Sequence, residues 1–175
     1  MKSLFTFLFS VLLFHANAQT LEEVNLSLNA STLFDTYTTG INNRGFVCGY
    51  YVNLGGIKAG YVINAKGKVI ILQGSSMTPS FTHVTVEGIN DSCTIVLSAT
   101  DGSGNISLYK GYYDSLQESY QLQAVSGNGQ PNVAKPYGIN NLNVYTGWYP
   151  NSTDRWLFTL NDSSASSNLE CRQVL

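Results

Sequence analysis

Charged side chains are scarce in this sequence. Asp, Glu, Lys and Arg make up 11% of its 175 residues, and the formal net charge at pH 7 is −2; globular proteins ordinarily carry about 25% charged residues. Nucleic-acid binding needs clusters of Lys and Arg that neutralise phosphates, and the nine basic residues form no such cluster. We therefore expect no nucleic-acid partner. Tyr, Ser, Asn, Gly and Thr fill the polar positions instead, which suits an uncharged extracellular surface built on β-strands.

Histidine and cysteine are also few. Beyond the N-terminal segment the only histidine is His83, and no Gly-x-Ser-x-Gly sequence accompanies it, so a Ser-His-Asp relay and a zinc site with several His ligands are both disfavoured. We expect His83 to be structural. Cys48, Cys93 and Cys171 show no Cys-x-x-Cys spacing. One disulfide among them is permitted, with its pairing left open, but buried cysteines acting as small apolar side chains are the favoured interpretation. We predict no metal and no cofactor.

Long apolar runs are absent except at the N-terminus. Lys2 precedes an apolar run from Leu4 to Phe14, and Ala16-Asn17-Ala18 supplies the small residues that a signal peptidase reads. The run is roughly half the ~20 residues that a membrane-spanning helix needs. Residues 1–18 are therefore predicted to be a secretory signal peptide, cleaved between Ala18 and Gln19, and no membrane span is expected. The short signal peptide is typical of a bacterial protein, secreted to the periplasm or the medium.

Residues 19–175 are predicted to form one all-β domain of three tandem repeats. Gly-Ile-Asn occurs at Gly40, Gly88 and Gly138, about every 50 residues, and each copy is followed by a turn of Asn, Asp, Gly and Ser. The repeats span about 30–78, 79–128 and 129–175. Each is expected to contain four antiparallel strands: 33–38, 46–52, 58–64 and 68–73; 81–87, 94–100, 106–114 and 119–125; 132–137, 144–150, 155–161 and 169–175.

The Gly-Ile-Asn sequence has a simple physical interpretation. Gly permits a close backbone approach, Ile anchors the strand end in the core, and Asn starts the turn. The following strand is apolar on both faces: Phe46, Cys48 and Tyr50 alternate with Val47, Gly49 and Tyr51. A strand with one solvated face would alternate apolar with polar residues. We therefore expect sheets stacked face to face.

The pattern Gly-Ile-Asn-Asn-x-Gly-x-x-x-Gly-x-Tyr, from Gly40 to Tyr51, resembles the extracellular HAF repeat family. The later strand of that repeat corresponds to Ala59-Gly60-Tyr61, Leu108-Tyr109-Lys110 and Trp156-Leu157-Phe158. The resemblance implies an exported protein built from four-stranded blades of the β-propeller type, and no particular activity. Propellers usually have four to eight blades. Three repeats therefore indicate a partial propeller or an open stack, with possible self-association through open sheet edges; a β-trefoil or β-prism is the alternative.

Carboxylates and aromatic residues are the remaining candidates for function. The aspartates lie mostly in predicted turns, where Asp is favoured for its backbone hydrogen bonds: Asp35, Asp91, Asp101, Asp114, Asp154 and Asp162. The loop at Asp101 lacks the Gly and Glu of a calcium-binding loop, so a hairpin turn is expected there. Tyr50, Trp148 and Tyr149 recur at related places and are the candidate ligand-binding residues, since aromatic faces beside Asn and Ser suit sugars. Filling space between sheets is the alternative role.

These patterns predict a secreted, non-catalytic β-repeat protein. Its expected role is to bind a carbohydrate or an extracellular protein, or to serve as a structural extracellular module. The alternative is a fragment or divergent member of an enzyme that acts on extracellular polysaccharide, for which two carboxylates about 5 to 9 Å apart in one pocket would be required.

Overall fold

The structure is a computed structural model that describes residues 33–77, 80–125, 135–150, 155–160 and 170–173. This part of the chain contains β-strands and one short 3₁₀ turn, η2 (Gly74–Ser76), and no α-helix. Within it, no helix is long and apolar enough to span a membrane. The all-β prediction is confirmed.

The strands form antiparallel sheets in which neighbours in the chain are neighbours in space. The first sheet comprises β1 (Leu33–Ile41), β2 (Val47–Asn53), β3 (Lys58–Ile63) and β4 (Val69–Leu72). The second comprises β5 (His83–Ile89), β6 (Ile95–Thr100), β7 (Ile106–Asp114) and β8 (Ser119–Ala124). The third comprises β9 (Lys135–Ile139), β10 (Tyr145–Pro150), β11 (Arg155–Leu160) and β12 (Glu170–Gln173). Each strand overlaps a predicted one, although β1, β5 and β9 continue through the Gly-Ile pair.

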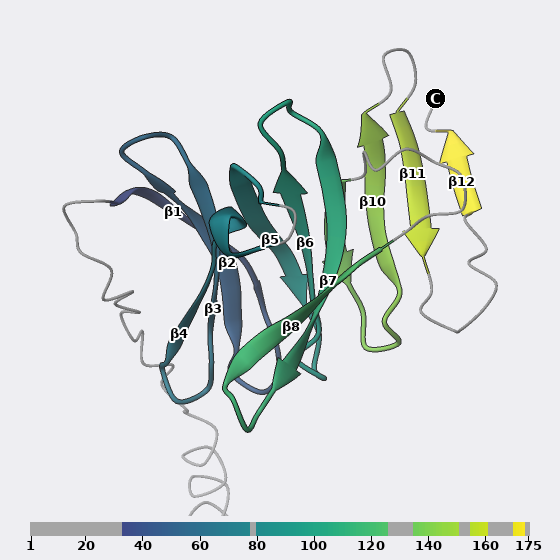
Figure 1. Ribbon diagram of the computed structural model, residues 1–175. Coiled ribbons are helices and arrows are strands. Elements are labelled where there is room, and N and C mark those ends of the chain that lie inside the picture. Colours follow the sequence, from purple (N-terminus) through teal and green to yellow (C-terminus); the bar gives the residue numbers. More distant parts are fainter. Residues whose placement is uncertain (1–32, 78–79, 126–134, 151–154, 161–169, 174–175) are drawn as a thin grey trace, which may run out of the picture.

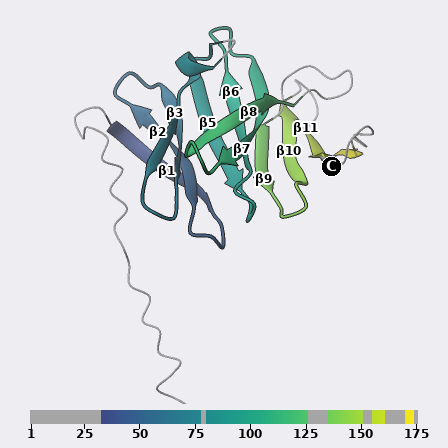
Figure 2. The ribbon, with the colours of Figure 1, turned by 60° about the horizontal axis from the view of Figure 1, so that its bottom comes forward.

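The three sheets stand side by side in chain order (Figures 1 and 2). Strand β5 is the centre of this arrangement, because it contacts β1, β2 and β3 of the first sheet and also β9 of the third. Strands β4 and β8 are the opposite margins of their sheets. The first strand of each later sheet therefore packs on several strands of the sheet before it: β5 on β1, β2 and β3, and β9 on β5, β6 and β7.

The main core lies between the first and second sheets. Its fully buried side chains come from alternate positions of both sheets: Cys48, Val62, Val84, Val86, Cys93, Ile95, Leu97 and Ala99. Burial of one Val, Ile or Leu side chain stabilises the fold by roughly 1.5–3 kcal/mol. The opposite face of the first sheet carries a second cluster in which Tyr51 packs with Ala59, Tyr61 and Ile63. Strand β2 is thus apolar and buried on both faces, as its sequence predicted.

The asparagine of each Gly-Ile-Asn forms the hairpin turn that follows it. The Oδ1 atoms of Asn42, Asn90 and Asn140 each accept hydrogen bonds from the backbone N–H groups two and four residues later, at 2.9–3.1 Å. The residue three positions later has positive φ in every case: Gly45 (75°), Cys93 (62°) and Asn143 (57°). This is the three-residue hairpin with a left-handed last residue. The predicted role of Asn in starting the turn is confirmed.

The same asparagines join one sheet to the next. Asn42 Nδ2 donates to the backbone oxygen of Asn90 (2.8 Å), and Asn90 Nδ2 donates to that of Asn140 (3.1 Å). The following residues form a parallel row: the carboxylate of Asp91 accepts from Asn43 N (2.9 Å) and Nδ2 (2.8 Å) and from Asn141 Nδ2 (2.7 Å). We call these two rows the asparagine ladder. The amide donors lower the pKa of Asp91, with the backbone N–H of Asn43 as the largest cause.

One glycine of the repeated sequence, Gly88, allows two sheets to approach closely. A Cβ on Gly88 would lie 3.0 Å from the Cα of Gly138, whereas one on Gly40 would lie at an ordinary contact distance, 3.6 Å, from Ile89 Cγ2. Ile89 is therefore held over the glycine of the preceding sheet and is 8% exposed, whereas Ile41 is 70% exposed. The expectation that every Ile of the pattern anchors the core is wrong for Ile41, because no described sheet precedes the first.

Replacing Asn90 by Ala is expected to lower the free energy of unfolding by about 2–4 kcal/mol, since two backbone donors lose their acceptor and two inter-sheet acceptors, Asn140 O and Asn143 Oδ1, lose their donor. Asn53 is the matched control. Its Oδ1 accepts from Gly55 N and Ile57 N in an exposed turn, where water replaces the lost acceptor. Asn53→Ala should cost about 1 kcal/mol or less. Urea unfolding measures both values, and equal losses would contradict a stabilising role for the ladder.

Replacing Gly88 by Ala is expected to cost about 1–3 kcal/mol, because the new methyl group would press on the backbone of the third sheet. Gly138, the equivalent residue one sheet later, is the control, since a Cβ there meets nothing within 4 Å. Gly138→Ala should change stability by less than about 0.5 kcal/mol. Thermal unfolding of the two variants distinguishes a steric cause from a general intolerance of alanine at this position.

Candidate functional site

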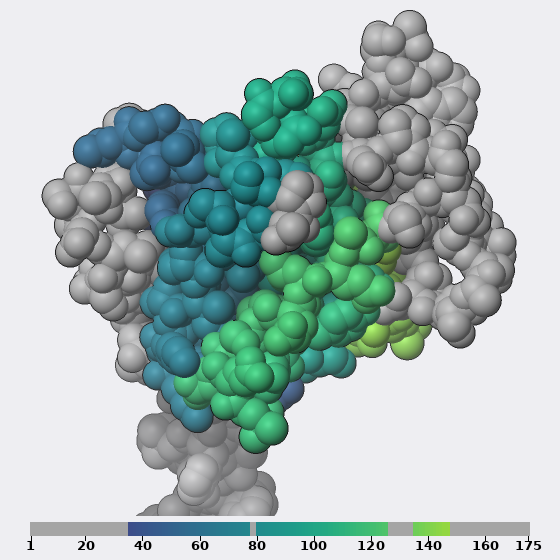
Figure 3. Space-filling model, in the orientation of Figure 1, coloured from purple at the N-terminus to yellow at the C-terminus, as the bar shows by residue number. Residues whose placement is uncertain are grey.

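A groove of about 450 Å³ lies between the outer margins of the first two sheets. We name it the β4–β8 groove after the strands that form its walls. Figure 3 shows the side of the molecule on which the first sheet, blue to teal, meets β8, green. The groove is lined by Ile70, Ile71, Leu72, Gln73, Ser76, Met77, Tyr109, Ser119, Tyr120 and Leu122. No carboxylate, histidine, cysteine or basic side chain is among these residues.

The first wall is β4, whose four residues are all apolar. Its pairing with β3 places Ile70 beside Val62, a core residue, so that Ile70 and Leu72 face the second sheet. Val69 and Ile71 turn to the opposite face and pack on the cluster around Tyr61. The short apolar strand thus presents an aliphatic surface to the groove.

The second wall is β8, where apolar and polar residues alternate. Tyr120 and Leu122 pack against the main core from the side of the second sheet, while Gln121 and Gln123 are exposed. Tyr109 of β7 completes the apolar lining, and its ring meets Phe81 edge to face at 5.7 Å between centroids. The groove is therefore the outward continuation of the core between the two sheets.

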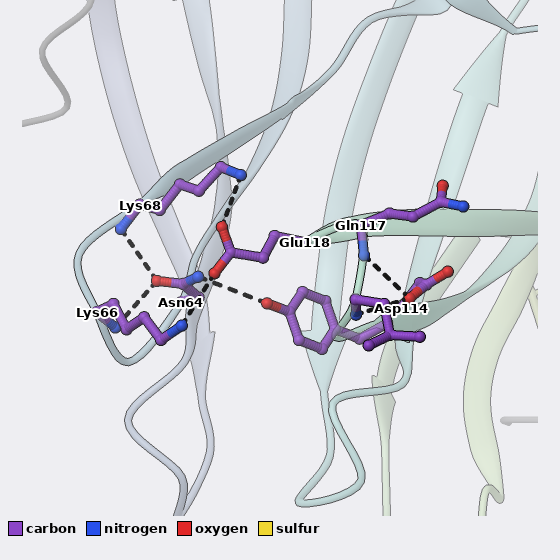
Figure 4. Close-up of polar contacts among 8 residues, drawn as sticks. Asn64, Lys66, Lys68, Asp114, Gln117 and Glu118 are labelled. Atoms are coloured by element: carbon purple, nitrogen blue, oxygen red, sulfur yellow. Dashed lines mark hydrogen bonds and ion pairs between the residues drawn. The ribbon is translucent and has the colours of Figure 1, made fainter.

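Two ion pairs join the hairpins at one end of the groove (Figure 4). Lys66 Nζ lies 3.1 Å from Glu118 Oε1, and Lys68 Nζ lies 2.8 Å from Glu118 Oε2. Nearby, Asn64 Nδ2 donates to the Tyr113 hydroxyl at 3.5 Å. The two ammonium groups, Lys68 above all, lower the pKa of Glu118. Exposed pairs stabilise little, but these hold β4 and β8 together where both strands begin.

The 3₁₀ turn η2 forms the other end of the groove. Ser76 Oγ donates to the backbone oxygen of Gln73 at 2.7 Å, and Phe81 N donates to the backbone oxygen of Gly74 at 2.9 Å. Gln73, Ser76 and Met77 line the groove here. The groove thus has an apolar middle and uncharged polar groups at this end, with Ser119 at the end near the ion pairs.

Tyr120 combines an aromatic surface with an unsatisfied polar atom. Its ring lies 5.5 Å from that of Tyr113, and its hydroxyl is buried with no hydrogen-bond partner among the described residues. Burial is the largest cause of a strongly raised pKa, followed by the nearby Cys93 and Cys48 thiols. Tyr120 therefore stays protonated, and its unpaired hydroxyl costs stability.

The predicted aromatic site does not coincide with the groove. Tyr50 lies on β2, stacked on Tyr37 with 4.8 Å between centroids and 20° between planes, and Lys58 Nζ lies 5.5 Å from its ring centroid. Trp148 and Tyr149 lie on β10, but their side chains are outside the described part of the structure. Their grouping as one ligand-binding site stays a prediction. None of the groove residues is among the ligand-binding candidates of the sequence analysis. The available signal is the lack of charged side chains in residues 69–73 and 119–125.

The other sequence candidates have structural roles. His83 Nδ1 accepts from the backbone N–H of Lys58 at 3.1 Å and so links the two sheets. Asp101 Oδ1 accepts from the N–H groups of Ser103 and Asn105, which confirms the hairpin turn. Among the described residues no group of three or more His, Cys, Asp or Glu side chains is placed to hold a metal ion.

The two described cysteine side chains are buried free thiols. Burial raises the pKa of Cys48 to about 11, an effect that the hydrogen bond with Thr39 only partly offsets. A thiol with this pKa is a poor nucleophile at neutral pH. Cys93 lies in the turn beside Asn42, whose Nδ2 is 3.5 Å from its sulfur. Both act as small apolar side chains, as expected, whereas the side chain of Cys171 lies outside the described part.

Replacing Tyr120 by Phe is expected to raise the free energy of unfolding by about 1 kcal/mol at pH 7, because it removes a buried unpaired hydroxyl. The raised pKa of Tyr120 makes this gain depend on pH. Above the ordinary pKa of 10.0 the tyrosine ionises in the unfolded chain but stays protonated in the folded protein, so the wild type loses stability as the pH rises. The gain should therefore increase above pH 10.

Tyr113→Phe is the control for this substitution, since the Tyr113 hydroxyl has a partner in Asn64. It should give no gain in stability. Urea unfolding at pH 7 and pH 10.5 tests both variants, and a loss of stability in Tyr120→Phe would show that its hydroxyl is satisfied in solution.

Comparison with known proteins assigns no family. No family model, no curated protein sequence and no solved structure matches the chain. The β4–β8 groove is therefore characterised by its own geometry and chemistry.

Proposed function

We propose that this protein is an exported, non-catalytic β-repeat module that binds an apolar ligand in the β4–β8 groove. The groove itself is the observation that carries the proposal. Its volume lies within the range of about 300–1,000 Å³ usual for small-molecule sites, and its lining combines aliphatic and aromatic side chains with a few uncharged polar groups. Because no carboxylate or histidine lines it, the groove offers binding without an obvious acid or base.

The proposal includes export and a repeated architecture. Export rests on the predicted signal peptide 1–18. The blade-like arrangement of three repeats is supported by the separate sheets, by the same asparagine turn in each sheet and by the ladder that joins these turns. A β-trefoil or β-prism is less well supported, because each sheet is a separate meander with its own four strands. The sheets are proposed to form part of a propeller or an open stack.

The alternative functions have weaker support. An enzyme acting on polysaccharide needs two carboxylates facing one pocket, whereas Asp91, Asp101 and Asp114 are occupied with turns and the ladder. Carbohydrate binding on aromatic faces remains a second candidate. The specific observation in its favour is the Tyr37–Tyr50 stack, since Tyr37 is 44% exposed and a flat aromatic pair suits a sugar ring.

The neutral dye N-phenyl-1-naphthylamine tests the proposed function, since its fluorescence rises in apolar sites. We expect saturable binding to the mature protein and at least a tenfold loss of affinity in Leu122→Trp, which fills the groove from β8. Leu116→Trp is the matched control. It introduces the same side chain on the same hairpin at a position that is 95% exposed, and it should bind the dye like the wild type.

Circular dichroism and urea unfolding establish that both variants are folded. Equal dye binding by wild type, Leu122→Trp and Leu116→Trp would place the dye elsewhere on the surface and would refute the groove as the binding site. Loss of binding in the Tyr50→Ala variant instead would favour the aromatic site.

A further inference from the structure

We propose that the ligand of the β4–β8 groove is an extended, uncharged peptide segment of a partner protein, which adds to the free edge of β8 as a further strand. This inference rests on the proposed function and specifies its ligand. It is carried by two features that occur together: an apolar groove and the unpaired backbone edge of a strand beside it.

The edge of β8 is free among the described residues. Strand β8 pairs with β7 through the register Tyr109–Ala124 to Asp114–Ser119 and is the last strand of its sheet. Every second backbone N–H and C=O of an edge strand points away from its sheet and lacks a strand partner. Proteins usually protect such an edge with charged residues or proline, and Ser119–Ala124 contains neither. Strand addition would satisfy these groups.

The side-chain pattern of the groove defines the peptide. In a strand paired with β8, alternate side chains would point to the same face as Tyr120 and Leu122, which is the groove, and the others would lie beside Gln121 and Gln123 on the opposite face. A segment that alternates apolar with small polar residues matches both faces. Because no charged side chain lines the groove, a charged residue at the inward positions would be desolvated without a partner.

The groove also continues an existing interface. Leu72 belongs to the main core, and Met77, Tyr120 and Leu122 pack against it, so an inserted apolar side chain would extend contacts already present between the two sheets. A small apolar molecule would fill the groove but would leave the edge of β8 unpaired. A peptide strand explains both the apolar lining and the uncharged edge, which is why we favour it.

The test uses an octapeptide of four Thr and four Val in alternation, with an amidated C-terminus and an uncharged dye joined to its N-terminus through an amide bond. Two further peptides carry backbone N-methyl groups on all Val residues or on all Thr residues. The N–H groups of successive residues in a strand point to opposite sides. N-methylation of one set therefore blocks pairing with β8, while N-methylation of the other set leaves that pairing intact.

We expect the parent peptide and one N-methylated isomer to bind the mature protein with similar affinity by fluorescence anisotropy. The other isomer should bind at least tenfold more weakly, which corresponds to about 1.4 kcal/mol. Leu122→Trp should weaken the parent peptide, and Leu116→Trp should not.

The outcomes separate this inference from the proposed function. Equal binding of both N-methylated isomers, or displacement of N-phenyl-1-naphthylamine by neutral monoacylglycerol but not by the peptide, would overturn the peptide strand and leave the groove as a small-molecule site. Failure of both dye and peptide to bind would refute the proposed function as well. Strand addition is supported if only one N-methylated isomer loses binding and if Leu122→Trp weakens binding of the parent peptide.

Discussion

The asparagine ladder is the interaction on which the arrangement of the sheets depends. One amide side chain in each sheet performs two tasks, since Oδ1 closes its own hairpin and, in Asn42 and Asn90, Nδ2 reaches the backbone of the next sheet. Amides that are buried must find such partners, because a buried polar group without one is costly. The ladder therefore fixes the turn and the contact between sheets with the same residue, and between the second and third sheets it is accompanied by the close approach that Gly88 permits.

The β4–β8 groove lies at the sheet margins opposite β1 and β5, the strands that lead into the ladder. The second sheet packs on the first where β5 meets β1, β2 and β3, and the third packs on the second where β9 meets β5, β6 and β7. The margins at β4 and β8 lie outside these main contacts, and between them lies the β4–β8 groove. The ion pairs of Glu118 with Lys66 and Lys68 join the margins at one end only. The groove thus lies beyond the strands through which the first two sheets make their main contacts.

Much of the fold could be predicted from the sequence, because its signals are local. The lack of apolar–polar alternation along β2 predicted burial on both faces, and Asn, Asp and Gly in the turns predicted hairpins, since these residues bond their own backbone or accept positive φ. The exposed Ile41 was mispredicted, because its equivalent Ile89 is buried by the preceding sheet and not by its own sequence neighbours. Tyr50, Trp148 and Tyr149 are predicted to bind a ligand because of their aromatic chemistry alone. The type of a side chain does not reveal which residues it contacts in the fold.

The sequence by itself determined the class of structure and the low proportion of charged residues. Its signals are antiparallel strands, tight turns and a repeated Gly-Ile-Asn, all of which act between residues near in the chain. Only the tertiary structure decided that Asn42 reaches Asn90, that Tyr120 buries an unpaired hydroxyl and that β4 and β8 enclose a groove. These features join residues about 50 positions apart. Their geometry depends on how whole sheets pack, and no local pattern of residue types specifies the width of the space between two sheet margins.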